Sequence, residues 1–108
     1  MGSRANIYID QGTDFRITLE LFDEDDLDLP ITGYTFYSSM RKLYSTAKAA
    51  EFEVYKANND ITLILDSDTT SLLDPGKYQY DVLMRKSTGE MSKIVEGLAF
   101  VISTITEV

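Results

Sequence analysis

The chain has 108 residues, of which 44% are hydrophobic and 26% charged, and it carries 18 acidic and 10 basic side chains. That length suits one domain with one core, while the formal net charge of -8 disfavours a nucleic-acid partner, which needs clustered Lys and Arg. Histidine and cysteine are absent, which excludes disulfides, thiolate nucleophiles, and the commonest general base and zinc ligand.

We interpret residues 1–4 as leader or vector-derived residues, and residues 5–108 as a single domain. No apolar run reaches the length of a signal peptide or of a membrane span. The absence of cysteine also fits a reducing compartment. We therefore expect a soluble protein that is not exported.

The first part of the chain alternates apolar and polar residues, which is typical of strands with one buried face. Residues 7–9 form a short strand that ends in a turn at residues 10–12, and residues 15–21 give the clearest alternation. An acidic loop follows at residues 23–28. The next strand covers residues 34–41, with its even-numbered side chains on one face.

Residues 43–50 have the only helix-favouring composition, but they are too few to form a stable helix, so we expect a crossing loop. Residues 51–56 and 61–66 alternate on either side of Ala57-Asn58-Asn59-Asp60. Asn and Asp tolerate left-handed backbone, so this segment predicts a hairpin.

Residues 67–73 can form one tight helical turn, which Asp74-Pro75-Gly76 ends. Alternation resumes over residues 77–86, where Tyr78 and Tyr80 fall on the predicted core side. A turn at residues 87–89 leads to the last strand, at about residues 93–103.

Seven short strands with frequent turn signals and no long helix predict an all-β fold, an antiparallel two-sheet β-sandwich of immunoglobulin-like topology. The missing cysteine pair and tryptophan exclude antibody-type domains. The run from Leu73 to Tyr78 looks like the turn before the sixth strand of fibronectin-like sandwiches, where a Tyr hydroxyl can bond to upstream backbone. A small β-barrel is the structural alternative.

Two Ser-x-x-Lys strings, Ser39 to Lys42 and Ser45 to Lys48, match a motif of penicillin-recognising enzymes. The first string lies on a predicted strand, where residues three apart point to opposite faces. The second lies in the crossing loop and lacks the companion motifs. We interpret both as chance matches.

The segment from Asp23 to Asp28 carries five carboxylates in six residues, a density that can attract calcium. An EF-hand is excluded because its required Gly and Glu positions hold Asp28 and Tyr34. Glycoside hydrolysis needs two carboxylates held at a defined separation, which a loop does not supply. We interpret the segment as a solvated connection, with weak calcium capture as the alternative, and predict no catalytic residue, metal site or cofactor.

The last strand is apolar on both faces, with Ile94, Leu98, Phe100 and Ile102 on one and Val95, Ala99 and Val101 on the other. A strand at the end of an antiparallel sandwich normally has one solvated face. The second face, assigned to Val95, Ala99 and Val101, is therefore the predicted assembly surface for a second copy or another protein.

Tyrosines give the alternative ligand surface, because Tyr combines a flat apolar ring with a polar group. Tyr8, Tyr37 and Tyr55 fall on the outward side of the alternation, whereas most other aromatics fall on the inward side. If the three formed one exposed platform, they could bind a carbohydrate.

Six short motifs follow one another along residues 7–103: Gln11-Gly12, Leu29 to Thr35, Met40-Arg41, Leu73 to Val82, Gly89, and Glu96-Gly97. Together they resemble the immunoglobulin-like domains of tailed-bacteriophage structural proteins, of the type found at the N-termini of upper-baseplate proteins. The segment Leu29-Pro30-Ile31-Thr32 departs from the usual run before Gly-Tyr-Thr.

The resemblance implies a non-enzymatic structural or adaptor domain in the tail or baseplate of a virion, made in the host cytoplasm. Its expected partners are other virion proteins or further copies of itself, without nucleic acid or membrane. A carbohydrate-binding module is the alternative, and an enzyme using the acidic loop is a more distant one.

Overall fold

The computed structural model describes residues 3–20, 33–45, 47–57 and 60–105. Apart from one short helix, α1 (Ser67–Ser71), its regular elements are strands: β1 (Ser3–Arg4), β2 (Ile7–Asp10), β3 (Phe15–Glu20), β4 (Thr35–Lys42), β5 (Lys48–Ala57), β6 (Asp60–Leu65), β7 (Gly76–Arg85) and β8 (Met91–Ile102). The prediction of an all-β fold is confirmed. The acidic segment at residues 23–28 lies outside the described residues.

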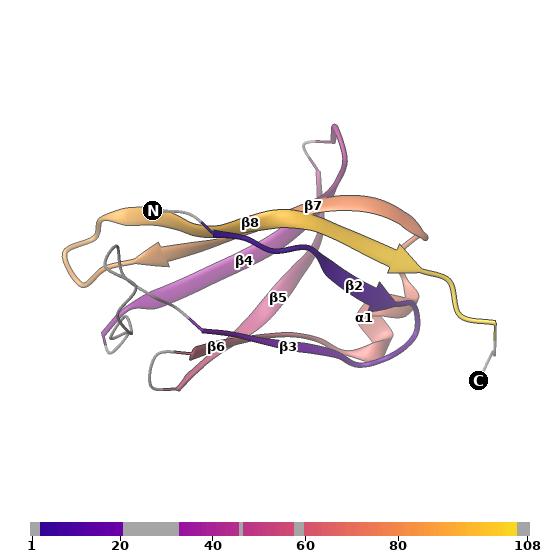
Figure 1. Ribbon diagram of the computed structural model, residues 1–108, viewed down its shortest axis with the longest axis horizontal. Coiled ribbons are helices and arrows are strands. Elements are labelled where there is room, and N and C mark those ends of the chain that lie inside the picture. The colour runs from indigo at the N-terminus through magenta and orange to yellow at the C-terminus, as the bar shows by residue number, and fades with distance from the viewer. Residues whose placement is uncertain (1–2, 21–32, 46, 58–59, 106–108) are drawn as a thin grey trace.

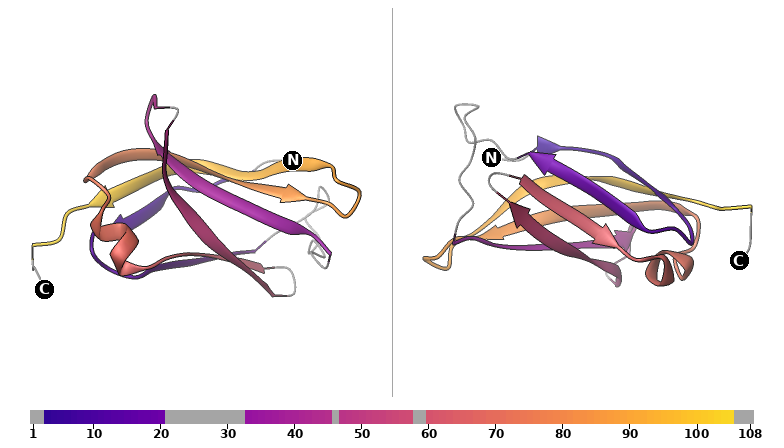
Figure 2. Two further views of the ribbon diagram at one scale, coloured as in Figure 1. Left: turned by 180° about the vertical axis from the view of Figure 1, so that it is seen from behind. Right: turned by 90° about the horizontal axis from the view of Figure 1, so that it is seen from below.

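The strands form one continuous, nearly closed sheet in the order β1-β8-β7-β4-β5-β6-β3, and β2 also pairs with β8. Strands β2, β8, β7 and β4 lie on one side of the core, and β3 and β6 on the other (Figure 1). β5 joins the two sides, because its first part, up to Phe52, pairs with β4 and its second part, from Glu53, pairs with β6 (Figure 2).

The N-terminal strand departs from the antiparallel expectation. β1 and β2 both run parallel to β8, whereas all other strand pairs in the described part of the chain are antiparallel. Ser3 lies opposite Val95 and Ile7 opposite Ala99, so β1 and β2 share one register and together count as one of the seven expected strands. Ser3 and Arg4, which we assigned to a leader, thus belong to the sheet.

Most predicted elements are found at or near their expected positions, including the β5–β6 hairpin, the helical turn α1 and the turn at Gly89, whose φ is 94°. The segment 43–50 differs, because β5 already begins at Lys48. Ala50 is buried opposite Met40 of β4. Pairing with β4 therefore overrides a helix-favouring composition, since propensity is a weak preference compared with tertiary contacts.

The core fills the space between the two sides of the sheet. Phe52 lies near its centre, with its ring centroid 6.1 Å from that of Phe15 and 6.2 Å from that of Tyr80. Tyr78 and Tyr80 are buried, as the alternation predicts. The aromatic contacts thus join β3, β5 and β7 across the interior.

Two hydrogen bonds fasten one end of the domain. The Tyr78 hydroxyl donates to the Asp74 carbonyl at 2.7 Å, the back-bond expected from the run before this strand. The Gln11 side-chain amide donates to the Leu73 carbonyl at 2.8 Å. The turn after β2 and the segment before β7 are therefore held together.

A second tyrosine holds the N-terminal strand from inside the core. The Tyr80 hydroxyl donates to the Ala5 carbonyl at 2.6 Å, and burial raises the pKa of Tyr80 to about 12, so the donor stays protonated at neutral pH. Gly97 lies directly opposite Tyr80, and a Cβ there would be 2.0 Å from the Ala5 oxygen. The backbone of Ala5 therefore occupies the space that any other residue at position 97 would fill.

The backbone of β8 completes this anchor. The Ala5 amide donates to the Glu96 carbonyl at 3.0 Å, and the Asn6 side-chain oxygen accepts from the Leu98 amide at 3.1 Å. The Asn6 side-chain oxygen thus takes the place of a backbone carbonyl as hydrogen-bond acceptor where the strand is interrupted between β1 and β2.

Tyr80→Phe should lower the free energy of unfolding by about 1–3 kcal/mol, because the part-buried Ala5 carbonyl loses its hydroxyl donor. Tyr80→Ala should cost about 3–5 kcal/mol, because it also leaves a cavity. Urea unfolding measures both. Tyr55→Phe, at an exposed position, is the control and should change stability by less than about 0.5 kcal/mol. Equal losses for Tyr80→Phe and Tyr55→Phe would contradict this role.

Gly97→Ala should displace the N-terminal strand, because the added methyl group collides with the Ala5 backbone. Hydrogen exchange measures the effect residue by residue. Amides of β2 should exchange faster, while amides in the β3–β6 pair, which does not pair with β8, keep their protection. Unchanged protection of the β2 amides would contradict this prediction, because it would show that the N-terminal strand accommodates the methyl group without losing its hydrogen bonds to β8.

Candidate functional site

The predicted assembly surface is wrong as assigned. Val95, Ala99 and Val101 are only 3%, 0% and 4% exposed and belong to the core. They can therefore contact neither a second copy nor another protein while the domain is folded.

A β-bulge separates Ile94 from Leu98, Phe100 and Ile102, with which the sequence alternation had grouped it. Val82 lies opposite Val95, and Leu83 lies opposite Lys93, so Ile94 is an extra residue in β8 and both Ile94 and Val95 are buried. The alternation of side chains changes phase at this point. Beyond Ile94 the alternation grouped the residues of β8 correctly, but it did not show that the face of Val95, Ala99 and Val101 is the buried one.

We call the solvent-facing side of β1, β2, β8, β7 and β4 the outer face. Cross-strand pairing and exposure place on it alternate residues of each strand. They are Arg4, Tyr8, Asp10, Thr35, Tyr37, Ser39, Arg41, Lys77, Gln79, Asp81, Leu83, Arg85, Met91, Lys93, Glu96, Leu98, Phe100 and Ile102. In the described part of the chain, no other element covers this face.

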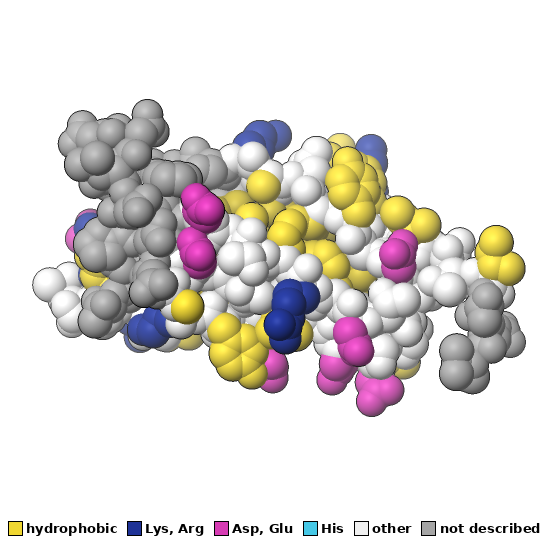
Figure 3. All heavy atoms as spheres, turned by 60° about the horizontal axis from the view of Figure 1, so that its bottom comes forward, with side chains coloured by type: hydrophobic (Ala, Val, Ile, Leu, Met, Phe, Trp, Pro, Cys, Tyr) yellow, Lys and Arg dark blue, Asp and Glu magenta, His cyan; other side chains and the backbone are white. Residues whose placement is uncertain are grey.

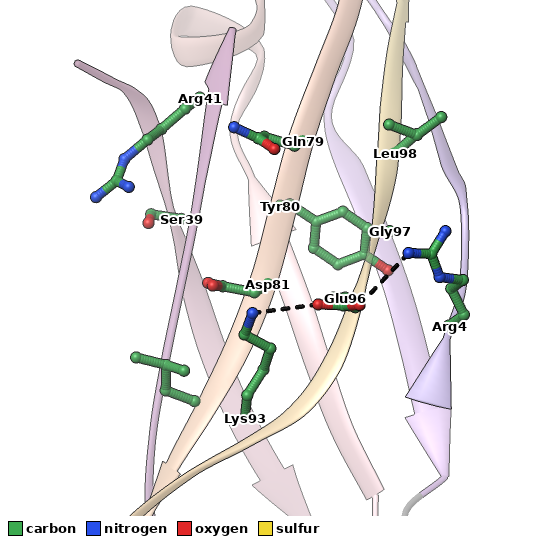
Figure 4. A pocket seen from close by; sticks show the side chains of 11 residues that line it. Arg4, Ser39, Arg41, Gln79, Tyr80, Asp81, Lys93, Glu96, Gly97 and Leu98 are labelled. Atoms are coloured by element: carbon green, nitrogen blue, oxygen red, sulfur yellow. Dashed lines mark hydrogen bonds and ion pairs between the residues drawn. The ribbon is translucent and has the colours of Figure 1, made fainter. Parts of the chain in front are cut away.

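A polar hollow of about 540 Å³ lies in the middle of the outer face, and Ser39, Arg41, Gln79 and Asp81 contribute to its lining (Figure 4). Its volume is in the range of small-ligand sites, but such sites are mostly apolar and aromatic, whereas this lining is mostly polar. The hollow thus offers hydrogen-bond donors and acceptors without an apolar slot.

Glu96 is the centre of the charges in the hollow. Lys93 Nζ lies 3.1 Å from one carboxylate oxygen of Glu96, and Arg4 Nη2 lies 3.5 Å from the other (Figure 4). The hydrogen bond and charge of Lys93, with a smaller contribution from Arg4, lower the pKa of Glu96. Asp81 lies opposite Glu96 across the strand pair, so the two cations also offset repulsion between these carboxylates.

Aromatic rings paired with cations stand at the two ends of the outer face. At one end, Tyr8 stacks on Phe100 with ring centroids 5.3 Å apart, and Lys77 Nζ lies 6.0 Å from the Phe100 centroid. At the other end, the guanidinium of Arg85 lies 5.7 Å from the centroid of Tyr37. Both contacts have cation–π geometry.

The three tyrosines of the alternative ligand surface are exposed but do not lie together. Tyr8, Tyr37 and Tyr55 are 63%, 41% and 60% exposed. Tyr8 stands at the level of Lys77, whereas Tyr37 is opposite Leu83, six residues or roughly 20 Å further along β7. Tyr55 lies in the part of β5 that pairs with β6, on the other side of the core. They form no single platform.

Tyr44 is an exposed aromatic that sequence reasoning missed. It is 96% exposed, with a φ of 66°, in the β4–β5 connection, which projects beyond the outer face (Figure 1). The Leu43 amide donates to the Lys77 carbonyl at 3.4 Å, so the connection starts beside the Tyr8 and Phe100 end. Nothing in the segment 43–50 distinguished Tyr44 from its neighbours.

The other chemical motifs do not form sites in the described residues. Ser39 is on the outer face, while Lys42, three residues later on β4, pairs with Asp74 at 3.5 Å. No group of three carboxylates in the described ranges is arranged to hold a metal ion. The calcium hypothesis concerns residues 23–28, outside those ranges, and stays a prediction.

None of the helical residues described forms a segment long and apolar enough to cross a membrane. Comparison with known protein families and with curated proteins found no match for this chain.

The Glu96 carboxyl should titrate below its usual pKa of 4.5, because Lys93 and Arg4 stabilise the charged form. A depressed pKa means that this pairing stabilises the fold above the unfolded-state pKa, and the stabilisation is lost as pH falls through the folded-state value. Lys93→Met should raise the Glu96 pKa in an NMR titration, whereas Lys86→Met, which removes the partner of Glu90, should leave it unchanged. If Lys93→Met leaves the pKa of Glu96 unchanged, Lys93 and Glu96 do not form an ion pair in solution.

Proposed function

We propose that this chain is a non-enzymatic structural or adaptor protein of a tailed-phage particle, in the tail or baseplate, and that it binds other proteins through the outer face. The observation that carries the protein-binding part is the outer face itself. It presents Tyr8 and Phe100 at one end and Tyr37 beside Arg85 at the other. Tyr, Phe and Arg are enriched in protein interfaces, and Tyr and Arg often dominate their binding energy.

The strand order supports an immunoglobulin-like sandwich within the continuous sheet. The order β8-β7-β4-β5 matches the G-F-C-C′ sheet of variable-type domains, and β6-β3 matches the E-B pair of the facing sheet. β5 would then supply the edge of one sheet with its first part and the edge of the other with its second part. The bond from Tyr78 to Asp74 also fits the tyrosine corner at the start of strand F.

The phage assignment rests on the sequence resemblance, and the structure gives the shared motifs a physical role. Gln11, Tyr78, Tyr80 and Gly97 fasten the frame of the domain. Motifs of this kind carry the fold from one member to another, while the exposed face is free to differ with the partner. We would expect this pattern, a shared set of fold-stabilising residues beneath a variable exposed face, in a family of assembly domains that bind different partners.

The carbohydrate-binding alternative is less well supported, because it required Tyr8, Tyr37 and Tyr55 in one platform. The polar hollow also lacks an exposed ring, since Tyr80, the one aromatic residue in its lining, is buried. Specific binding to a glycan array would favour this alternative over protein binding.

Mass spectrometry of purified particles of the encoding phage tests the proposal, and we expect the chain as a stoichiometric component. Particles assembled with Tyr8→Asp should contain at least about tenfold less of it, because an interface aromatic typically contributes more than about 1.4 kcal/mol. Leu72→Asp is the matched control, since Leu72 is exposed at the end of α1, outside the outer face. Absence of the wild-type chain from particles would refute the virion assignment, and normal incorporation of Tyr8→Asp would refute the role of the outer face.

A further inference from the structure

The outer face is positively charged relative to the rest of a chain whose formal net charge is -8. Its cations exceed its carboxylates, and Glu96, one of the two acids that line its hollow, is already paired with Arg4 and Lys93. Arg41, Lys77 and Arg85 form no ion pair with any residue that the structure describes. Among the described residues, these three cations therefore have no carboxylate partner.

The opposite side of the molecule has the complementary charge. We call the solvent-facing side of β3, β6 and the second part of β5 the β3–β6 face. It carries Glu20, Glu53 and Asp60 against one cation, Arg16. Figure 3 brings this side of the molecule forward and shows carboxylates, in magenta, at both of its ends.

Two of these carboxylates stand directly against each other. Glu20 lies opposite Asp60 in the β3–β6 pair, an arrangement of like charges that destabilises a sheet. On the outer face, Arg4 and Lys93 offset the equivalent repulsion between Asp81 and Glu96. Among the described residues, no cation pairs with Glu20 or Asp60, so a cation from a partner would relieve their repulsion.

Each face also has apolar surface among its charges. The outer face has Leu83 and Leu98, both half-buried, and the β3–β6 face has half-buried Ile64 beside exposed Tyr55. Protein interfaces commonly combine such an apolar centre with a polar rim.

We infer that the outer face of one copy docks on the β3–β6 face of a second copy, so that copies associate head to tail. The partner is a second copy because this chain itself carries the acidic surface that Arg41, Lys77 and Arg85 require. Two β3–β6 faces repel each other, which disfavours that face pairing with itself. The inference rests on the proposed function in treating the outer face as a protein-binding surface.

The symmetry of the contact follows from the two faces being different surfaces on opposite sides of the core (Figure 1). A contact of this kind is heterologous, so each copy keeps one face open after a first contact. Repetition then gives a ring or an open filament, rather than a closed pair.

The test measures molar mass by light scattering during size-exclusion chromatography over a concentration series. The wild-type chain should form assemblies that grow with concentration and dissociate as salt rises to about 1 M, where surface charges are screened. Arg41→Glu with Arg85→Glu removes cations from the outer face, and Glu53→Lys with Asp60→Lys removes carboxylates from the β3–β6 face. Each double variant should be monomeric, with the circular dichroism spectrum of the folded domain.

Mixing the two double variants is the decisive measurement. The first keeps an intact β3–β6 face and the second an intact outer face, so an equimolar mixture should assemble again. The reversed outer face of the first variant also complements the reversed β3–β6 face of the second, so the mixture can grow beyond a dimer. Lys86→Glu and Glu90→Lys reverse charges in the β7–β8 turn, outside both faces, and should leave the wild-type assembly unchanged.

Several results would overturn the inference. These are a wild-type chain that is monomeric at millimolar concentration and low salt, a Glu53→Lys, Asp60→Lys variant that still assembles, or a mixture that stays monomeric. A wild-type monomer that is nevertheless present in particles would refute self-association and leave the proposed function standing. Head-to-tail assembly of a chain that is absent from particles would do the reverse.

Discussion

The hydrogen bond from the Tyr80 hydroxyl to the Ala5 carbonyl fixes the path of the N-terminal strand, and the missing side chain at Gly97 makes room for it. Beyond this point the strand continues as β2, which buries Ile7 and Ile9 and turns Tyr8 outward. Tyr8 then stacks on Phe100 of β8. One end of the outer face thus depends on a contact made inside the core.

Local alternation was enough to predict most of the strands, because a half-buried strand repeats its burial every two residues. Phe15, Ile17 and Leu19 face inward on β3, and Tyr78 and Tyr80 do so on β7. Pairing partners are a different matter, since they depend on contacts between segments far apart in sequence. The parallel pairing of β2 with β8 and the division of β5 between β4 and β6 are of this kind.

The candidate site was harder to predict, because both faces of β8 are apolar and alternation does not show which of the two is buried. The structure buries Val95, Ala99 and Val101, and the bulge adds Ile94 to the buried side. Exposure of individual tyrosines followed from alternation, whereas their mutual distances depended on sheet order. Alternation could not predict the exposure of Tyr44, because Tyr44 lies in the connection between β4 and β5 rather than in a strand.

The parallel course of β2 and β8 has a mechanical consequence. Because the two strands run in the same direction, the start of the N-terminal strand and the end of β8 lie at opposite ends of the pair (Figure 1). A force that pulls the two chain ends apart therefore acts along the strands and across the evenly spaced, slanted hydrogen bonds between them. Those bonds share the load and must break together, whereas an antiparallel pair pulled at adjacent ends opens one bond at a time. The domain is thus built to resist tension applied through its ends.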